Sequence, residues 1–415
     1  MRSIPPLPVN ESKDADAVRA VALGAQRLGG RALLVGGFVR DAILAQMGQG
    51  QPSKDLDVEV FGLDLDSLRA LLSDLGVVDE IGASFAVLRV RGIDVDFSLP
   101  RRDQKTGSGH RGFLVSADPS MSLEQAARRR DFTVNSISAD PLTGEVIDPV
   151  GGGADLREGV LRATDSASFG EDPLRALRAV QMAARFSLVP SKELPALMAS
   201  QDLGQLPAER VEQELSKFLL RGVMPSRGIE LLRDGCGLNA LPGLETTDDV
   251  WWERAQALDR WVHCRPGERA LALAEGWTLL SLGTTHKERL RLFGRVRPPV
   301  ATQKAVLALH AVPLPETKPG VRKAARALGV ERTSLASLFR VHASRSIDVD
   351  VPRGLAVSVG LLHSAPKDVV LGRHLLALGL TPSPRFGELL SHCRAVQDET
   401  GLDDADEILR RALEY

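Results

Sequence analysis

The sequence predicts an α+β protein, with a mixed sheet and helices in its N-terminal part and helices alone in the remainder. The prediction rests on a single change of pattern along the chain. From residue 31 to residue 150, short runs rich in β-branched residues alternate with helical segments, and such runs are typical of strands. From residue 173 onward, apolar residues recur at spacings of three and four, which is typical of amphipathic helices.

The strand-like runs occupy residues 32–37, 55–62, 85–100 and 144–149, and residues 67–76 have the pattern of an amphipathic helix. The helical segments that follow lie at residues 174–186, 209–220, 228–237, 268–282, 321–330 and 405–415. We therefore expect five parts. They are an N-terminal helical extension (1–30), an α/β head (31–150), and an all-α neck (151–222), body (223–345) and tail (346–415).

The composition indicates a globular protein with a large core. The chain has 415 residues, of which 43% are hydrophobic and 26% charged, enough for about two to four domains. Its three cysteines, Cys236, Cys264 and Cys393, lack CxxC spacing, which argues against a disulfide framework or a zinc site. Residues 1–15 lack the apolar region of a signal peptide, and no apolar run approaches the roughly 18 residues that span a bilayer. We expect a cytoplasmic protein without membrane association.

The stretch LLVGGFVRD (33–41) joins a predicted strand to a predicted helix through Gly36 and Gly37. Because glycine lacks Cβ and tolerates positive φ, such a turn lets the backbone approach a ligand closely, which suits a phosphate group. The spacing matches neither GxGxxG nor GxxxxGK, and an isolated Gly-Gly is also an ordinary tight turn. Arg40 would add a positive charge beside it. We expect Asp41 either to orient Arg40 or to cap the helix.

Two acidic residues, Asp55 and Asp57, lie two apart in a strand-like run. Residues i and i+2 of a strand face the same side, so both carboxylates would point the same way. Carboxylate oxygens suit Mg²⁺, with Mn²⁺ as the alternative ion. Asp96, in another strand-like run, is the expected third acid, and Asp94 is the alternative. A solvated strand face with alternating acids would give the same pattern.

Several long motifs follow one another in a fixed order. They are LLVGGFVRDAIL (33–44), KDLDVEVFG (54–62), RRDFTVNSISADPLTGEVIDPVGGGADL (129–156), FGEDPLRALRAVQMAARF (169–186) and LPAERVEQELSKFLL (206–220). In order and spacing they resemble the motifs of the bacterial class II tRNA nucleotidyltransferases and bacterial poly(A) polymerases, from about residue 32 to residue 220. Residues 381–415 resemble the C-terminal segment of some members of this family.

The resemblance implies template-independent addition of C and A from CTP and ATP to the 3′ end of tRNA, with release of pyrophosphate. The head would then be the catalytic domain, and the tRNA acceptor end the partner, with no obligate protein partner inferred. The polar loop at 103–113, which looks full length here, argues against an enzyme restricted to CC addition. The alternatives are an enzyme that adds only the terminal A, a bacterial poly(A) polymerase, and an inactive tRNA-binding protein.

The resemblance also implies roles for individual residues. Asp55, Asp57 and Asp96 would be catalytic, with Asp55 and Asp57 holding the metal ion. The nucleotide would contact Gly36, Gly37, Arg40, Arg130, Asn135, Asp172, Arg175 and Arg178. Within this set, Asp172 and Arg175 would read the base edge, because a carboxylate accepts and a guanidinium donates hydrogen bonds there. We expect Asp172, Arg175 and Arg178 to lie along one helical face.

One position departs from the family pattern. Gln181 stands where many members have an arginine, and Arg185 would partly compensate.

The helical body should supply the RNA contacts, because aromatic residues make up only 4% of the chain and stacking on aromatic rings cannot be the main mode of binding. The candidate RNA-binding residues, which lie in two basic stretches, are Lys287, Arg289, Lys318, Arg322, Lys323 and Arg326. Their charges would bind phosphates and shape rather than base sequence. A solvated basic face would give the same pattern.

Overall fold

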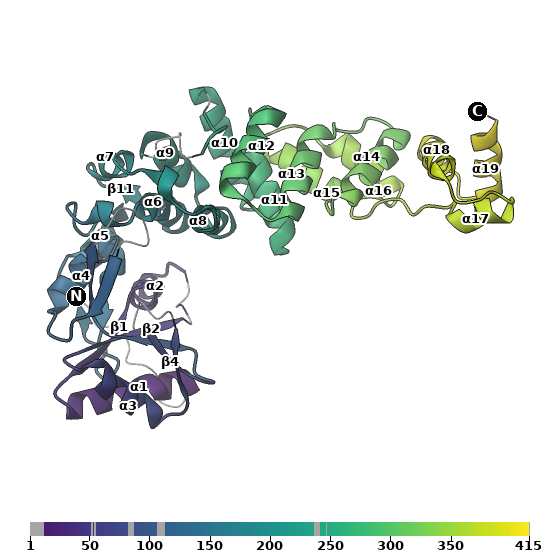
Figure 1. Cartoon of the computed structure of the whole chain (residues 1–415). Coiled ribbons are helices and arrows are strands. Elements are labelled where there is room, and N and C mark those ends of the chain that lie inside the picture. Colours follow the sequence, from purple (N-terminus) through teal and green to yellow (C-terminus); the bar gives the residue numbers. More distant parts are fainter. Residues whose placement is uncertain are drawn as a thin grey trace. The chain divides into compact units, whose positions relative to one another are not determined.

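The computed structural model describes residues 12–50, 53, 55–81, 87–105, 113–235, 241–245 and 247–414. The chain forms two compact units: Met1–Pro207 with Asp234–Ala240, and Ala208–Arg233 with Leu241–Tyr415. The first unit contains the main sheet, and the helices of the second follow along the chain (Figure 1). The expected neck, residues 151–222, is divided between these units.

The first unit is built on a mixed seven-stranded sheet of order β3-β4-β5-β2-β1-β8-β9. Its strands are β1 (Arg31–Val35), β2 (Leu56–Phe61), β3 (Val78–Ile81), β4 (Val87–Val90), β5 (Val95–Ser98), β8 (Ser138–Ala139) and β9 (Val146–Ile147). Strands β2 and β5 pair in parallel, and the other neighbouring strands described in this sheet pair antiparallel. The α+β class predicted from the sequence is confirmed.

Helices α1 (Lys13–Arg27) and α3 (Leu65–Ser73) pack together on the sheet (Figure 1). Ser12 caps α1 by accepting a hydrogen bond from the Ala15 N–H at 3.0 Å, which satisfies one of the free amides of the first turn. The region predicted as an N-terminal extension therefore contributes a helix to the head itself.

The predicted strand at 85–100 is two strands, β4 and β5, separated by a turn. Gly92 has φ 77° in this turn, a conformation that L-residues with a side chain rarely adopt. The continuous alternation of apolar residues hides the turn in the sequence, because both strands bury the same face.

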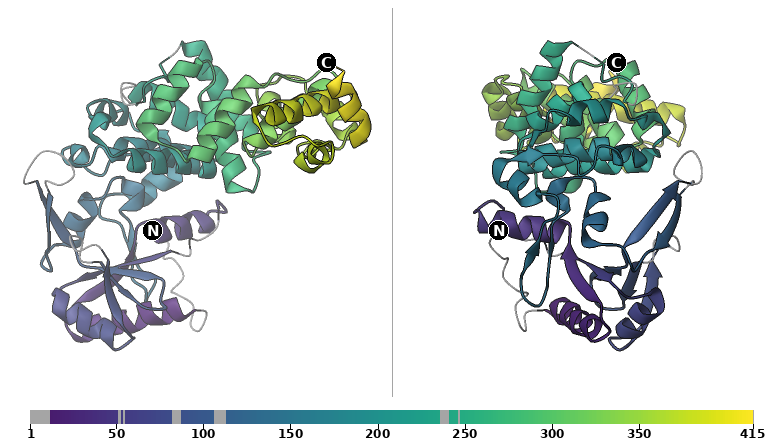
Figure 2. Two further views of the ribbon diagram at one scale, coloured as in Figure 1. Left: turned by 45° about the vertical axis from the view of Figure 1, so that its right-hand side comes forward. Right: turned by 90° about the vertical axis from the view of Figure 1, so that its left-hand side faces the viewer.

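The polar stretch 103–113 was expected to be a loop, but its ends belong to strands. Strand β6 (Arg101–Lys105) pairs antiparallel with β7 (Phe113–Ala117) in a separate two-stranded sheet (Figure 2). Residues 106–112 of the expected loop lie outside the described part of the chain.

The rest of the first unit consists of short elements around α2 (Gly37–Gln46) and α6 (Leu174–Phe186). They are α4 (Leu123–Arg128), η1 (Thr133–Asn135), α5 (Gly152–Glu158), β10 (Val160–Leu161), η2 (Phe169–Glu171), β11 (Val189–Pro190), α7 (Leu194–Ala199) and η3 (Leu203–Gln205). Helix α6 buries most of its length, with Ala176, Ala179 and Val180 at 0% exposure.

The second unit is helical throughout its described part. Its helices are α8 (Ala208–Arg221), α9 (Pro225–Gly235), α10 (Asp248–Trp261), α11 (Arg269–Leu280), α12 (His286–Val296), α13 (Val300–Ala311), α14 (Lys318–Val330), α15 (Leu335–Ser344), α16 (Asp350–Ser358), α17 (Gly372–Ala377), α18 (Pro384–Thr400) and α19 (Ala405–Leu413). Helix α11 is central and contacts α8, α10, α13 and α15. Its buried Glu275 accepts hydrogen bonds from Trp261 Nε1 and from Arg340, which offsets the cost of burying a charge.

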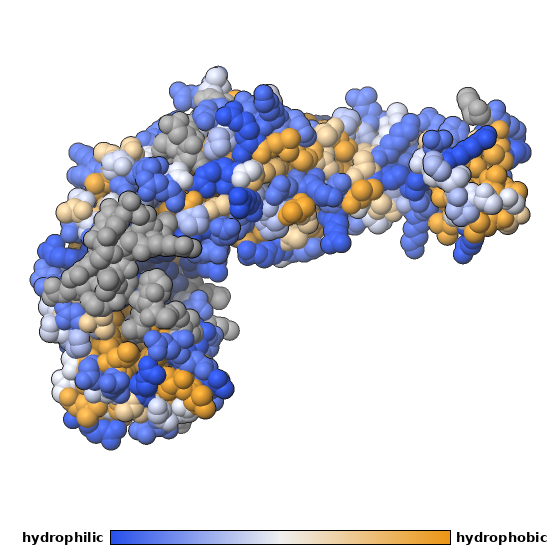
Figure 3. All heavy atoms as spheres, viewed as in Figure 1, coloured by the Kyte–Doolittle hydropathy of each residue, from blue (hydrophilic) through white to orange (hydrophobic). Residues whose placement is uncertain are grey.

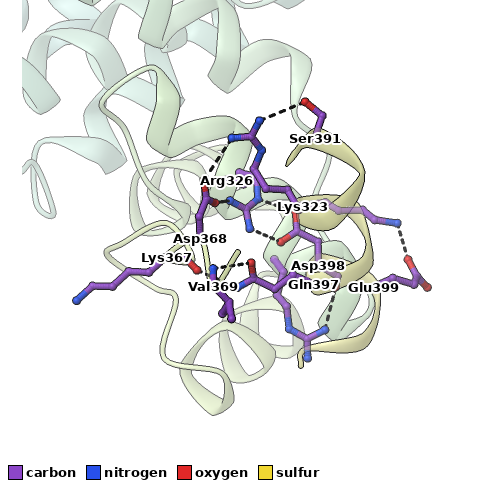
Figure 4. A network of polar contacts seen from close by, with 11 residues as sticks. Lys323, Arg326, Lys367, Asp368, Val369, Ser391, Gln397, Asp398 and Glu399 are labelled. Carbon is purple, nitrogen blue, oxygen red and sulfur yellow. Dashed lines mark hydrogen bonds and ion pairs between the residues drawn. The ribbon is translucent and has the colours of Figure 1, made fainter. Parts of the chain in front are cut away.

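The C-terminal helices have an apolar core of their own, which includes Leu375, Cys393 and Ile408. Ion pairs connect the C-terminal helices to α14. Arg326 of α14 pairs with Asp398 and Asp368, and Lys323 pairs with Glu399 at 2.6 Å (Figure 4). Apolar side chains also lie among polar ones on the surface of the body helices and at the C-terminal end (Figure 3). Within the described residues, no helix is both long and apolar enough to cross a membrane.

Candidate active site

A row of acidic side chains lies on one face of β2. Leu56, Val58 and Val60 alternate with them and are buried, so the strand turns its apolar side to the core and its acids the other way. Asp57 lies on that strand, and Asp55 directly precedes it; both are exposed. Asp57 is the register partner of Asp96 on the parallel strand β5. The three predicted catalytic acids are thus brought to one region.

The charges in this region repel one another. The pKa of Asp57 is raised, first because the surrounding protein removes part of its hydration and then because of the charges of Asp96 and Asp55, although Arg130 acts in the opposite direction. A divalent cation with oxygen ligands would relieve this repulsion, so the donor set fits Mg²⁺. The described residues contain no ready-made group of three or more metal-ligating side chains, and Asp96 is engaged by Arg89 at 2.7 Å.

Two arginines lie against the Gly-Gly turn. Gly36 has φ 69° and ψ −127°, which disfavours any residue with a side chain. A Cβ at Gly36 would lie 3.2 Å from Arg130 Nη1, and one at Gly37 would lie 3.5 Å from Arg40 Nη2. Glu59, two residues after Asp57, accepts a hydrogen bond from Arg130 Nη2 at 3.1 Å. The turn, the carboxylates and Arg130 therefore form one connected site.

Arg40 is buried and held on several sides. Its Nε donates to Asp41 Oδ1 at 2.8 Å, and its Nη1 donates to Asn135 Oδ1 at 2.5 Å. Its guanidinium carbon lies 4.2 Å from the centre of the Phe186 ring. Burial lowers the pKa of Arg40, although the charge of Asp41 opposes this shift. Of the two roles expected for Asp41, the structure shows orientation of Arg40, because α2 has no acidic residue in its first turn.

Asp131 connects Asn135 to Arg178 and was not among the predicted site residues. Its carboxylate accepts hydrogen bonds from the Phe132 N–H at 2.8 Å, from Asn135 Nδ2 at 3.0 Å and from Arg178 Nε at 2.6 Å. Burial by itself would raise the pKa of Asp131, but the charge of Arg178 and these hydrogen bonds bring it below its ordinary value. The signals in the sequence were its position directly after Arg130 and its place in the motif at 129–156.

Asp172, Arg175 and Arg178, which were expected to lie along one helical face, are not all on the helix. Asp172 has extended backbone angles and precedes α6; its Oδ1 accepts a hydrogen bond from the Leu174 N–H at 3.1 Å. Arg175, in the first turn, donates to the carbonyls of Ser168 and Arg129 at 2.8 and 2.7 Å. The residue before a proline is biased toward extended backbone angles. Asp172 precedes Pro173 and therefore stays outside the helix.

Gln181, the departure from the family pattern, is buried, and its Nε2 donates no hydrogen bond to any of the described residues. Arg185, one turn later, lies with Nη2 3.6 Å from Asp41 Oδ2. Arg185 thus lies near the acid that orients Arg40, and compensation for Gln181 stays a prediction.

The expected RNA-binding residues differ in their surroundings. Arg322 donates to the Asp398 carbonyl at 2.9 Å, and Lys323 and Arg326 are in the ion pairs described above. Arg289 donates to Thr284 Oγ1 at 3.1 Å. These four side chains make contacts within the protein, whereas Lys287 and Lys318 are exposed.

Comparison with known proteins finds similar sequences and folds. Residues 32–162 match the family model of the poly A polymerase head domain. A protein of Xanthomonas campestris pv. campestris (strain B100) named "Multifunctional CCA protein" is 42% identical over 222 residues, which are 51% of this chain and 51% of that protein. The chain thus spans about half the length of the curated relatives it matches.

Two solved structures match nearly the whole chain. The CCA-adding enzyme of Bacillus stearothermophilus in complex with CTP has a TM-score of 0.72 at 21% identity, covering 97% of this chain and 98% of that one. The CCA-adding enzyme of Thermotoga maritima complexed with tRNA has a TM-score of 0.66 at 19% identity, covering 100% and 99%. Residues 32–162 therefore resemble the poly A polymerase head domain, and the chain has the fold of the CCA-adding enzymes.

Proposed function

We propose that the protein is a template-independent tRNA nucleotidyltransferase that adds C and A from CTP and ATP to the tRNA 3′ end, releasing pyrophosphate. The observation that carries the proposal is the placement of Asp55 and Asp57 beside a Gly-Gly turn with Arg130. Carboxylates for a metal ion and cations for a triphosphate are the two requirements of phosphoryl transfer. The relatives named CCA proteins support the same assignment.

In this reaction, the 3′ hydroxyl of the tRNA attacks the α-phosphate of the nucleotide. Asp55 and Asp57 would hold Mg²⁺, or Mn²⁺ in its place, and Asp96 is the third acid of the site. When bound, the ion would lower the pKa of the hydroxyl and neutralise charge on the phosphates. Arg130, held by Glu59 at 3.1 Å, and the turn at Gly36 and Gly37 would fix the triphosphate, so catalysis is largely positioning.

Asp172 and Arg175 are proposed to select the base. Both side chains are partly exposed, and both now satisfy neighbouring backbone groups. An incoming base would replace these backbone partners with its own acceptor and donor groups. Arg178 and Asn135 would support them through Asp131.

The division of labour along the chain is part of the proposal: catalysis in the head (31–150), base selection in the neck (151–222), and tRNA contact in the body (223–345) and tail (346–415). Among the six candidate RNA-binding residues, the exposed Lys287 and Lys318 are the first to test. The acceptor end of tRNA would be the partner in the cytoplasm, without an obligate protein partner.

The test offers tRNA transcripts that end before CCA, after C and after CC to the purified protein, with Mg²⁺ and CTP, ATP or both. Completion of all three to CCA followed by arrest is the expected result. Extension of only the CC-ended transcript by one A would mark an A-adding enzyme, and long A tracts would mark a poly(A) polymerase.

Asp57→Asn should abolish nucleotide incorporation. Asp79 is an exposed acid of β3, and the control variant Asp79→Asn should retain incorporation. Absence of incorporation by the wild-type protein would favour an inactive tRNA-binding protein.

A further inference from the structure

A row of charged side chains crosses four strands of the sheet at one level. Asp57 on β2 is the register partner of Asp96 on β5, and Arg89 on β4 is the register partner of Asp79 on β3. The β4–β5 pairing places Leu88 opposite Phe97, so Arg89 and Asp96 follow as the next pair. Directly paired residues project from the same face of a sheet. Arg89 therefore lies on the face that carries the proposed metal-binding acids.

Arg89 is directed toward Asp96. Its Nε and Nη2 lie 2.7 and 2.5 Å from Asp96 Oδ1, and its Nη1 lies 3.9 Å from Asp94 Oδ1. Asp79, on the other side of Arg89, is occupied by Arg91, which donates to both of its oxygens at 2.8 and 2.9 Å. Arg89 thus forms an ion pair with the carboxylate of Asp96, whereas Asp55 and Asp57 form none with the residues that the structure describes.

We propose that Arg89 is a positioning residue, an internal counter-ion that competes with a divalent cation for Asp96. The inference rests on the proposed function, since it assumes that the cation binds at Asp57. Two cations cannot share one carboxylate oxygen without repulsion. Arg89 therefore weakens metal binding to the protein without nucleotide. The side chain is 41% exposed, so it can leave Asp96 when the metal arrives together with the triphosphate.

The experiment measures Mn²⁺ binding to the full chain without nucleotide, from the electron paramagnetic resonance signal of free Mn²⁺ at fixed ionic strength. Arg89→Met removes the counter-ion and should lower the dissociation constant at least about fivefold, because one like charge near the ion is lost. Arg89→Lys keeps the charge and should stay within about twofold of the wild type. Arg91→Met is the matched control: it removes an arginine from the same strand edge and should leave the affinity unchanged.

The outcomes separate this proposal from the one on which it rests. Mn²⁺ binding that is lost in Asp57→Asn but unchanged or weakened in Arg89→Met overturns the counter-ion role alone. An equal gain in Arg89→Met and Arg91→Met also overturns it, because general electrostatics would then suffice. Mn²⁺ binding by neither the wild type nor Arg89→Met overturns both proposals. Tighter binding only in Arg89→Met supports both.

Discussion

Replacing Asp131 by asparagine tests whether its hydrogen bonds with Phe132, Asn135 and Arg178 stabilise the first unit. An asparagine keeps the oxygen that accepts from Asn135 and from the Phe132 N–H. It presents an NH₂ group to Arg178, whose Nε and Nη2 lie 2.6 and 2.5 Å from the other carboxylate oxygen. Two charge-assisted hydrogen bonds are lost, and a guanidinium faces donors instead of an acceptor.

The expected loss of stability in Asp131→Asn depends on how deeply the Asp131–Arg178 pair is buried. Removing one partner of a fully buried pair costs about 3–5 kcal/mol, but the side chain of Arg178 is 39% exposed, so water replaces part of the loss. We expect a destabilisation of about 2–3 kcal/mol, which corresponds to about 4–12 °C for a unit of this size. Asp79→Asn breaks an ion pair whose side chains are 68% and 47% exposed and should cost less than about 1 kcal/mol.

The assay is thermal unfolding of the wild type and both variants, followed by circular dichroism between about pH 8 and about pH 3, a range that extends below the ordinary carboxyl pKa of about 4. The folded-state pKa of Asp131 is depressed, so its contribution is complete above the unfolded pKa of about 4 and is lost as the pH falls toward the folded value. The gap between wild type and Asp131→Asn should be constant from pH 8 to pH 5 and shrink below pH 4. Equal losses in the two variants, or a gap that widens in acid, would refute the reasoning.

Three further predictions concern other parts of the chain. Gly36→Ala should weaken CTP binding more than Gly48→Ala in a fluorescence titration, because both glycines have positive φ but only the Cβ at Gly36 meets Arg130; equal effects would assign the loss to strain alone. Arg326→Met should make the C-terminal helices more sensitive to proteolysis than Lys323→Met, since Arg326 pairs with two acids and is the less exposed; similar cleavage would contradict this.

Burial lowers the pKa of His310 to about 3, so the second unit should lose up to about 1.4 kcal/mol of stability per pH unit as the pH falls below 6.5. Replacing His310 with asparagine should flatten that dependence in urea unfolding, and an unchanged slope would count against it.

The sequence predicted the parts of the site that local pattern determines. Alternation along β2 placed Asp55 and Asp57 on one face, and the two glycines predicted the turn before α2. Which residue pairs with which depends on contacts between segments far apart in the chain. Nothing local indicates that Glu59 holds Arg130 or that Arg89 lies on Asp96, because these pairs depend on strand order and register.

The basic stretch of α14 also contains ion pairs that the local sequence does not indicate. Its run of positive charges suggested an RNA-binding face. The sequence alone does not show which acidic side chains these cations meet in the folded protein. In the fold, Asp398 is 72 residues from Arg326 and meets it through both carboxylate oxygens. Charge composition predicts a surface only where the three-dimensional structure leaves the charges uncovered.

Four arginines of the proposed site have their charges balanced by neighbouring carboxylates. Arg40, Arg89, Arg130 and Arg178 are each paired with a carboxylate, namely Asp41, Asp96, Glu59 and Asp131. Asp55 and Asp57 add two further negative charges, so these side chains together carry no surplus of positive charge for a triphosphate. The pairing fixes the guanidinium groups in place at the cost of their net attraction, which is the arrangement that preorganised catalysis favours. Under the proposed function, a divalent cation would supply the positive charge, so metal ion and nucleotide should each strengthen the binding of the other.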